Sequence, residues 1–350
     1  MIEPMAFKLP EAVVRALREI EPAIKGRTLE TAAVARVLNI LDALPPRAVV
    51  RADHELPWIL GLYTSSVAKG AFWRPWGSPR ANDIAALARV PGLDHLFLFH
   101  RDGHVREAAL RRIDGGIRSP FFFAAVALRL NDWAVPVRAA AVACADRAFP
   151  ATDPAVVGAA AMFLLEQRYR WLRWSPAETG PLDRALQRTA VAGALVESLC
   201  RAGRGPVGRL LRSALRGPGF DSSLEPLATS ARLPDIRGIA LQALIERRVR
   251  WPSYRQKQWI DKSMGRYREG WAYASRPVEH AMTIEAAVAL AARDRSAAVR
   301  RLAVIALLTR HRALANFDEV AAILAVDRNA VLRERTAFAL DMQTGAATAG

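Results

Sequence analysis

The sequence has little cysteine, little lysine and few aromatic residues, and each shortage excludes a class of protein. Its two cysteines, Cys144 and Cys200, are too few for a disulfide framework, and neither belongs to a CxxC zinc or redox motif. Both lie in apolar stretches, which predicts small buried side chains. Aromatic residues make up only 7% of a chain that is 52% hydrophobic. Because Ala, Leu and Val supply most of that apolar content, the composition favours closely packed helices over disorder.

Long apolar runs and signature motifs of common enzymes are also missing. The most apolar stretch, residues 154–165, is shorter than the ~20 residues that span a bilayer. The first residues lack the basic start and apolar run of a signal peptide. No phosphate loop, nucleophile elbow or dinucleotide fingerprint occurs, and Ser66 and Lys69 form an isolated Ser-x-x-Lys without its companion motifs. We therefore expect a soluble cytoplasmic protein with no cofactor, no metal site and no evident small-molecule substrate.

Positive charge dominates the composition of the chain. The formal net charge is +16, and 45 arginines stand against five lysines. The arginine excess fits either bidentate phosphate binding or the codon bias of a GC-rich genome. The positive balance itself predicts attraction to a polyanion, either nucleic acid or an acidic protein.

A short motif recurs along the chain: a polar turn, an aliphatic residue followed by Arg, and a small residue three positions later. Its arginines are Arg106, Arg138, Arg237, Arg300 and Arg333. They are separated by 32, 99, 63 and 33 residues, which fit one period of about 33 with skipped registers near Arg170, Arg204 and Arg268. The skipped registers are expected to be helical. The turn aspartate would cap the following helix, and the arginine would reach an aspartate in its own or the neighbouring turn.

The motif resembles the D-x-x-x-V-R-x-x-A core of the HEAT-like repeat family, over about residues 91–342. The resemblance implies an all-α fold, a right-handed α-solenoid of stacked helical hairpins of the HEAT-like or armadillo-like kind. We expect residues 1–90 to form an N-terminal helical cap with degenerate first repeats, since residues 10–20 and 27–44 have helical apolar spacing. Residues 91–343 would form the array, and 344–350 a flexible tail.

Two basic segments are candidate binding sites for nucleic acid or an acidic partner. The first contains Arg204, Arg209, Arg212 and Arg216, of which the last three would share one helical face and track a phosphate backbone. The second interleaves cations with Trp and Tyr, as in surfaces that stack bases and hold phosphates. Its candidate binding residues are Arg250, Arg255, Lys257, Trp259, Lys262, Arg266 and Arg268. A solvated helix face is the alternative for the first segment, and aromatic core packing for the second.

Other clusters are assigned structural roles. The motif arginines are predicted to serve the fold, because repetition indicates an interface between repeats. His95, His100 and His104 are predicted to be loop residues and not metal ligands, because a turn separates them. The cluster Tyr169, Arg170, Trp171, Arg173 and Trp174 resembles the second basic segment and would join it if the repeats align them.

The function predicted first is that of a non-enzymatic scaffold for an acidic macromolecular partner, most simply a protein. The alternative is nucleic-acid backbone binding through a basic concave face. That alternative includes HEAT-like alkylpurine DNA glycosylases, for which Trp259 with Asp261, or Trp133 with Asp132, supply the residue types. HEAT-like bilin lyases share the repeat type, but no residue here distinguishes them.

Overall fold

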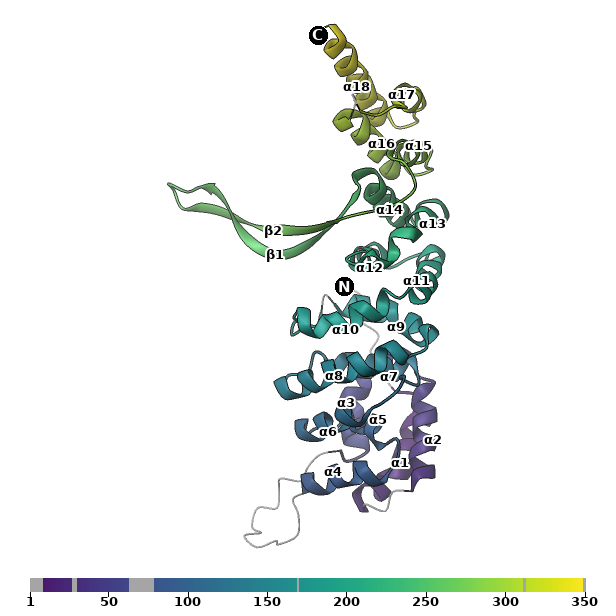
Figure 1. Ribbon diagram of the computed structural model, residues 1–350, viewed down its shortest axis with the longest axis vertical. Helices are drawn as coiled ribbons and strands as arrows, with labels where there is room; N and C mark the ends of the chain where they lie inside the picture. Colours follow the sequence, from purple (N-terminus) through teal and green to yellow (C-terminus); the bar gives the residue numbers. More distant parts are fainter. Residues whose placement is uncertain (1–8, 27–29, 63–78, 169, 311–312, 349–350) are drawn as a thin grey trace. The chain divides into compact units, whose positions relative to one another are not determined.

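The computed structural model describes residues 9–26, 30–62, 79–168, 170–310 and 313–348. Within these ranges it is predominantly helical, with eighteen α-helices, two short 3₁₀ helices and one two-stranded antiparallel sheet (Figure 1). The chain divides into two compact units, Met1–Val191 and Ala192–Gly350. The division falls inside α11 and therefore within the predicted array. Ser66 and Lys69 lie outside the described residues, in the stretch 63–78.

The first unit contains ten complete helices and one 3₁₀ turn. They are α1 (Glu11–Gly26), α2 (Thr31–Asp42), η1 (Pro46–Ala48), α3 (Val49–Ile59), α4 (Pro79–Arg89), α5 (Leu93–Phe97), α6 (Gly103–Arg112), α7 (Pro120–Arg129), α8 (Val135–Ala151), α9 (Pro154–Gln167) and α10 (Pro176–Leu186). The two helices predicted before Pro45 are confirmed as α1 and α2. The helix α7 is buried on nearly all sides and packs against α2, α3, α8 and α9, so that its three phenylalanines form the centre of this unit.

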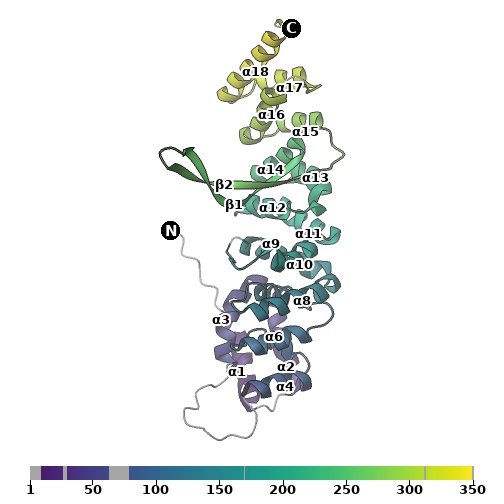
Figure 2. The same ribbon diagram turned by 60° about the vertical axis from the view of Figure 1, so that its left-hand side comes forward.

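The second unit contains the remaining helices and the sheet. Its elements are α11 (Thr189–Arg201), which crosses the division, α12 (Val207–Ala214), η2 (Pro218–Ser223), α13 (Leu224–Ser230), α14 (Pro234–Glu246), β1 (Arg248–Asp261), β2 (Arg266–Pro277), α15 (Ile284–Ala292), α16 (Ala297–Arg310), α17 (Phe317–Ala325) and α18 (Ala330–Thr348). In this unit α14 packs on α16 and α16 on α18, while α13, α15 and α17 follow the other side (Figure 2). The helix α18 extends into the segment expected to be a tail.

Local sequence explains where these helices begin. Five of them carry proline in the first turn, where a missing N–H costs nothing. Side chains of Asp102, Ser119, Asp153, Ser175 and Thr283 accept hydrogen bonds from backbone N–H groups at the helix starts that follow them. Apolar side chains on the inner faces of the helices, such as Leu211, Leu241 and Leu244 of the second unit, are fully buried and form its core.

The motif arginines form a repeated contact that joins one helical turn to the next. Arg106 donates through Nε and Nη2 to the carboxylate of Asp132, at 2.9 Å each, and through Nη1 to the carbonyls of residues 100 and 101. Arg237 makes the same fork to Asp294 at 2.7 and 2.9 Å. Arg300 repeats it on Asp327 at 2.5 and 2.8 Å. The predicted pairing of motif arginines with turn aspartates is confirmed for these three, and the partner belongs to the neighbouring turn.

The aspartate in each pair also starts its own helix. Asp132, Asp294 and Asp327 each accept a hydrogen bond from the backbone N–H two residues later, at 3.0, 2.7 and 2.8 Å. Burial raises the pKa of the Asp132 carboxyl, but the hydrogen bond from Arg106 and the charge of Arg129 outweigh that effect, so the pKa lies below its usual value. The carboxylates therefore remain charged, order the turn before a helix and hold the preceding turn at once. We call this set of contacts the Arg–Asp ladder.

The ladder corrects the predicted register near Arg268. Arg237 bonds directly to Asp294, so no repeat lies between Arg237 and Arg300. The thirty residues of the hairpin, 248–277, account for the excess, and removing them from the 63-residue interval leaves 33. The prediction of a decayed helical register there was wrong, because this segment forms two strands inserted into one period.

Candidate functional site

The inserted β-hairpin is the feature that separates this chain from a plain array of helices. Strands β1 and β2 pair from Arg248 opposite Pro277 to Asp261 opposite Arg266. Gly265 in the connecting turn has φ of 66°, which favours glycine. Asp261 accepts hydrogen bonds from the N–H and hydroxyl of Ser263 and the N–H of Met264, which stabilise the turn and lower the pKa of the Asp261 carboxyl.

The base of the hairpin is fixed to the helices of its unit. Arg276 at the end of β2 forks onto Asp221 at 2.6 and 2.8 Å and also donates to the carbonyls of Leu215 and Gly217. Val249 and Val278 are buried beside it. Beyond this base the ribbon extends away from α12 and α14 (Figure 1). The helices therefore hold an otherwise solvent-exposed ribbon by one end.

Strand alternation sorts the hairpin side chains onto two faces. On β2 the larger side chains Tyr267, Glu269, Trp271 and Tyr273 alternate with Gly270, Ala272 and Ala274. Their register partners on β1 are, in the same order, Trp259, Lys257, Arg255 and Pro252, and Arg250 lies opposite Ser275. We call the face that carries Trp259, Lys257, Tyr267, Glu269, Trp271, Tyr273, Pro252 and Arg250 the aromatic–cationic face. The Arg255 side chain lies outside the part of the chain that the structure describes.

The rings of the aromatic–cationic face are open to solvent. Trp259 is 49% exposed, Tyr267 45%, Trp271 46% and Tyr273 65%. The Lys257 Nζ lies 4.4 Å from the centre of the Tyr267 ring, and Trp259 meets the same ring edge-on at 5.6 Å. Burial of aromatic surface against a partner lowers the free energy, so a cluster of exposed rings marks a surface suited to binding. These rings are not core residues, which removes the structural alternative that the sequence allowed for them.

The hairpin is strongly cationic. Between residues 248 and 277 the acids are Asp261 and Glu269, whereas the basic residues are Arg248, Arg250, Arg255, Lys257, Lys262, Arg266, Arg268 and Arg276. Eight positive against two negative groups give +6 over thirty residues, out of +16 for the whole chain. Lys257, Lys262, Arg266 and Arg268 are all exposed. The Arg268 Nε donates to the side-chain oxygen of Gln258 across the ribbon, at 3.0 Å.

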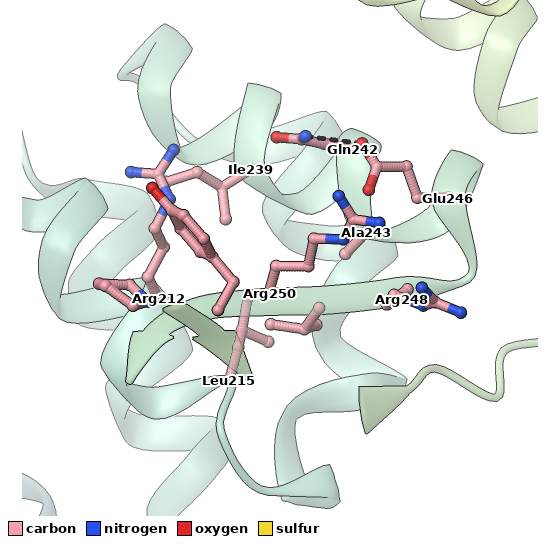
Figure 3. Close-up of a pocket in the computed structure, with 11 residues that line it drawn as sticks. Arg212, Leu215, Ile239, Gln242, Ala243, Glu246, Arg248 and Arg250 are labelled. Carbon is pink, nitrogen blue, oxygen red and sulfur yellow. Dashed lines mark hydrogen bonds between the residues drawn. The ribbon is translucent and has the colours of Figure 1, made fainter. Parts of the chain in front are cut away.

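A pocket of about 450 Å³ continues the aromatic–cationic face at its base (Figure 3). Arg250, Pro252 and Tyr273 of that face line one side of the pocket, and Arg212 of α12 lines it from the helices. Glu246 is the one acid of its lining and accepts a hydrogen bond from Gln242 at 2.7 Å. The Arg250 side chain reaches across the pocket toward α14, and Arg248 also lines the pocket. Cations from α12 and β1 thus surround one cavity.

The structure brings together only part of the first predicted segment. Arg209 and Arg212 are exposed on α12, and Arg204 is exposed in the loop before that helix. Arg216 lies beyond the end of α12 at Ala214 and is half-buried, so the predicted three-residue helical face is wrong in its last member. The second segment was predicted within a helical array and lies on strands instead. Arg212 and Arg250 are the residues through which the two predicted segments meet.

Three ring residues of this surface, Tyr267, Trp271 and Tyr273, are not among the site residues predicted from the sequence. The period-two alternation of Tyr267, Trp271 and Tyr273 with small residues was the signal that could have selected them. It was outweighed by the assumption of a continuous helical repeat.

The remaining candidates have structural roles in the described residues. Trp171 is buried and meets Trp174 edge-on at 4.9 Å, Arg170 pairs with Glu166, and Tyr169 lies outside the described residues. The Asp132 carboxylate is occupied by the ladder, although Trp133 beside it is exposed. Cys144 is buried as predicted, and burial raises its pKa to about 12, whereas Cys200 is only half-buried.

The prediction that His95, His100 and His104 all lie in loops was wrong. His95 belongs to α5 and His104 to the first turn of α6, while His100 is buried between them. Burial lowers the pKa of His100 to about 4, and its Nδ1 accepts a hydrogen bond from the backbone N–H of Asp102. No three His, Cys, Asp or Glu side chains in the described ranges converge as metal ligands would.

Comparison with known proteins adds no relative: no protein-family model, curated protein or solved structure matches the chain. Among the helices of the described ranges, none has the length and apolar character needed to cross a bilayer.

Proposed function

We propose that this chain is a non-enzymatic nucleic-acid-binding protein in which the β-hairpin is the principal contact surface. The observation that carries the proposal is the exposure of four aromatic rings beside lysine and arginine on one face of the ribbon. A solvated charged surface needs no exposed rings, and a core needs no cations between its rings. Nucleic acid presents both complements, because bases offer flat π-faces and phosphates offer negative charge.

We further propose that the helices are HEAT-like repeats stacked as a right-handed α-solenoid that carries the hairpin. The Arg–Asp ladder supports this, because the same fork recurs at Arg106, Arg237 and Arg300 with the partner in the following turn. The restored interval of 33 residues around the hairpin supports it as well. In such an array each turn holds the next, so the hairpin has a rigid base.

The test is the salt dependence of binding to fluorescein-labelled oligonucleotides, measured by fluorescence anisotropy. Engagement of roughly four to six phosphates predicts that log K falls with log salt with a slope of about −3 to −4. Neutralising Lys257 and Arg250 to glutamine should make the slope shallower by about 1.4. Absence of binding to DNA and to RNA at low salt would refute the proposal.

A second candidate, an acidic protein held along the helices, is supported by a separate groove. A cavity of about 470 Å³ between α14 and α16 is lined by Ile245, Leu302 and Ile305, with Glu246 and Arg310 beside them. Such an apolar groove suits an amphipathic segment whose acidic residue meets Arg310. An affinity pull-down with and without nuclease separates the two candidates, because a protein partner is retained after nuclease treatment and a nucleic-acid bridge is lost.

A further inference from the structure

We infer that the aromatic–cationic face binds single-stranded nucleic acid in an extended form, with bases stacked on its rings. This inference rests on the proposed function and specifies its ligand. The strand would run from Trp259 and Tyr267 near the tip, along Trp271 and Tyr273, to the pocket between Arg212 and Arg250. Each step of this path is a feature of one continuous surface.

The spacing of the rings favours a single strand over a duplex. Side chains on one face of a strand recur every two residues, about 6.6 Å apart. Bases stacked in a duplex are about 3.4 Å apart along each strand. Trp271 and Tyr273 are two residues apart, about 6.6 Å, and Tyr267 and Trp271 are four apart, about 13 Å. Rings at these spacings match a strand whose bases are separated from one another, so that a protein ring replaces a neighbouring base. Duplex bases expose only their edges, which flat rings at this spacing do not read.

The position of the cations fits the same path. Lys257 lies over the Tyr267 ring, between the tip pair and Trp271, where the backbone of a strand stacked on both would pass. Glu269 is opposite Lys257 and is the one acid of this face. At the base, Arg212 and Arg250 line the pocket beside Tyr273, so a phosphate that follows the last stacked base meets two guanidinium groups.

The opposite face of the hairpin carries no ring on β2 and provides a control. Gly270, Ala272 and Ala274 lie there on β2, with Trp251 and Tyr254 as register partners of Ala274 and Ala272 on β1, and Gln256 lies exposed opposite Gly270. Tyr267 and Tyr273 are six residues apart, about 20 Å on a strand. With one nucleotide for each same-face position from Tyr267 to Tyr273, the surface accommodates about four nucleotides.

The test compares fluorescein-labelled dT6 and dT12 with a 12-base-pair duplex and with poly-glutamate, using the full chain at one fixed salt concentration. We expect dT6 to bind nearly as tightly as dT12, and both at least tenfold tighter than the duplex. Trp271→Leu and Tyr273→Leu should each weaken dT12 binding about five- to 150-fold, the range measured for single base–ring stacks. Trp271→Phe should retain most of the affinity because it keeps a π-face, and Gln256→Ala should change nothing.

The outcomes separate this inference from the proposed function. Equal binding of duplex and dT12 with no effect of Trp271→Leu would overturn the inference and leave nucleic-acid binding intact. Binding of poly-glutamate alone would overturn both. If Trp271→Leu and Gln256→Ala weaken dT12 equally, the effect is loss of the hairpin and not of stacking, which also overturns the inference. Concentration-dependent self-association abolished by Trp271→Leu, without dT12 binding, would assign the face to a second copy of the chain.

Discussion

Arg106 and Arg237 in the helices and Lys257 and Arg268 in the hairpin carry the same charge in opposite surroundings. The Arg106 side chain is 4% exposed and its partner Asp132 is 1% exposed, whereas the four cations around the hairpin tip stand in solvent. In the ladder every guanidinium fork is closed on a carboxylate that also accepts a backbone N–H in the turn before a helix. In the hairpin the cations alternate with exposed rings. A cation therefore serves folding here when an aspartate is buried with it, and we propose that it serves binding when exposed rings accompany it.

The largest effect is expected from breaking the ladder at Asp132. Asp132→Asn can still accept from the Ala134 N–H, but it leaves the buried guanidinium of Arg106 without its anion and Arg129 paired with Asp53 alone. We expect the free energy of unfolding in urea to fall by about 3–5 kcal/mol. The matched control is Asp146→Asn, which breaks the exposed pair with Arg184 and should cost less than about 1 kcal/mol. Equal losses would mean that the ladder is no more than a surface network.

A smaller loss of unfolding free energy is expected at low pH, because the titrating residue His100 lies among the helices and not in the hairpin. The buried His100 has a pKa of about 4, below the 6.5 of the unfolded chain, and its carbonyl accepts from Arg106. The unfolded state therefore binds the proton first, so stability is complete above pH 6.5 and is lost as the pH falls toward 4. We expect about 2 kcal/mol of loss from this group between pH 7 and pH 5.

His100→Asn tests that assignment, because its side-chain oxygen can accept from the Asp102 N–H without titrating. The variant should lose about 2 kcal/mol less than the parent chain when urea unfolding is repeated at pH 7 and pH 5. An unchanged pH dependence would place the acid sensitivity in other groups. Residues 248–277 contain no histidine, so oligonucleotide affinity should not weaken over the same range.

An arginine-to-lysine exchange in both regions gives the sharpest contrast in role. Arg237→Lys removes the fork to Asp294 and should cost about 1–2 kcal/mol of unfolding free energy, since lysine cannot place two planar donors. Arg268→Lys keeps the charge on an exposed strand. It should change neither stability nor dT12 affinity by more than about twofold. A large loss of binding in Arg268→Lys would indicate a bidentate contact in place of general charge.

Sequence reasoning found the repeat but not the insertion in it. The period of the motif arginines and their aspartate partners follow from local rules of capping and spacing, which act within one turn of chain. The hairpin did not follow, because residues 248–277 replace part of a 63-residue interval that resembles two periods. Gly265 in the turn and the alternation of Tyr267, Trp271 and Tyr273 were local signals for strands. Arg212 and Arg250 line the same pocket because α12 packs beside β1, and sequence spacing does not reveal this tertiary packing.

Excision of the hairpin tests the central claim most directly. Arg250 and Ser275 are register partners, so residues 251–274 can be replaced by Asn-Gly to close a two-residue turn while the anchor Arg276 is kept. We expect the free energy of unfolding to change by no more than about 1 kcal/mol, because the removed surface is largely exposed. Affinity for dT12 should fall by more than about 100-fold, the loss of two or more stacked bases. Retained affinity for dT12 in the excised chain would contradict the account, because it would place the contact on the helices.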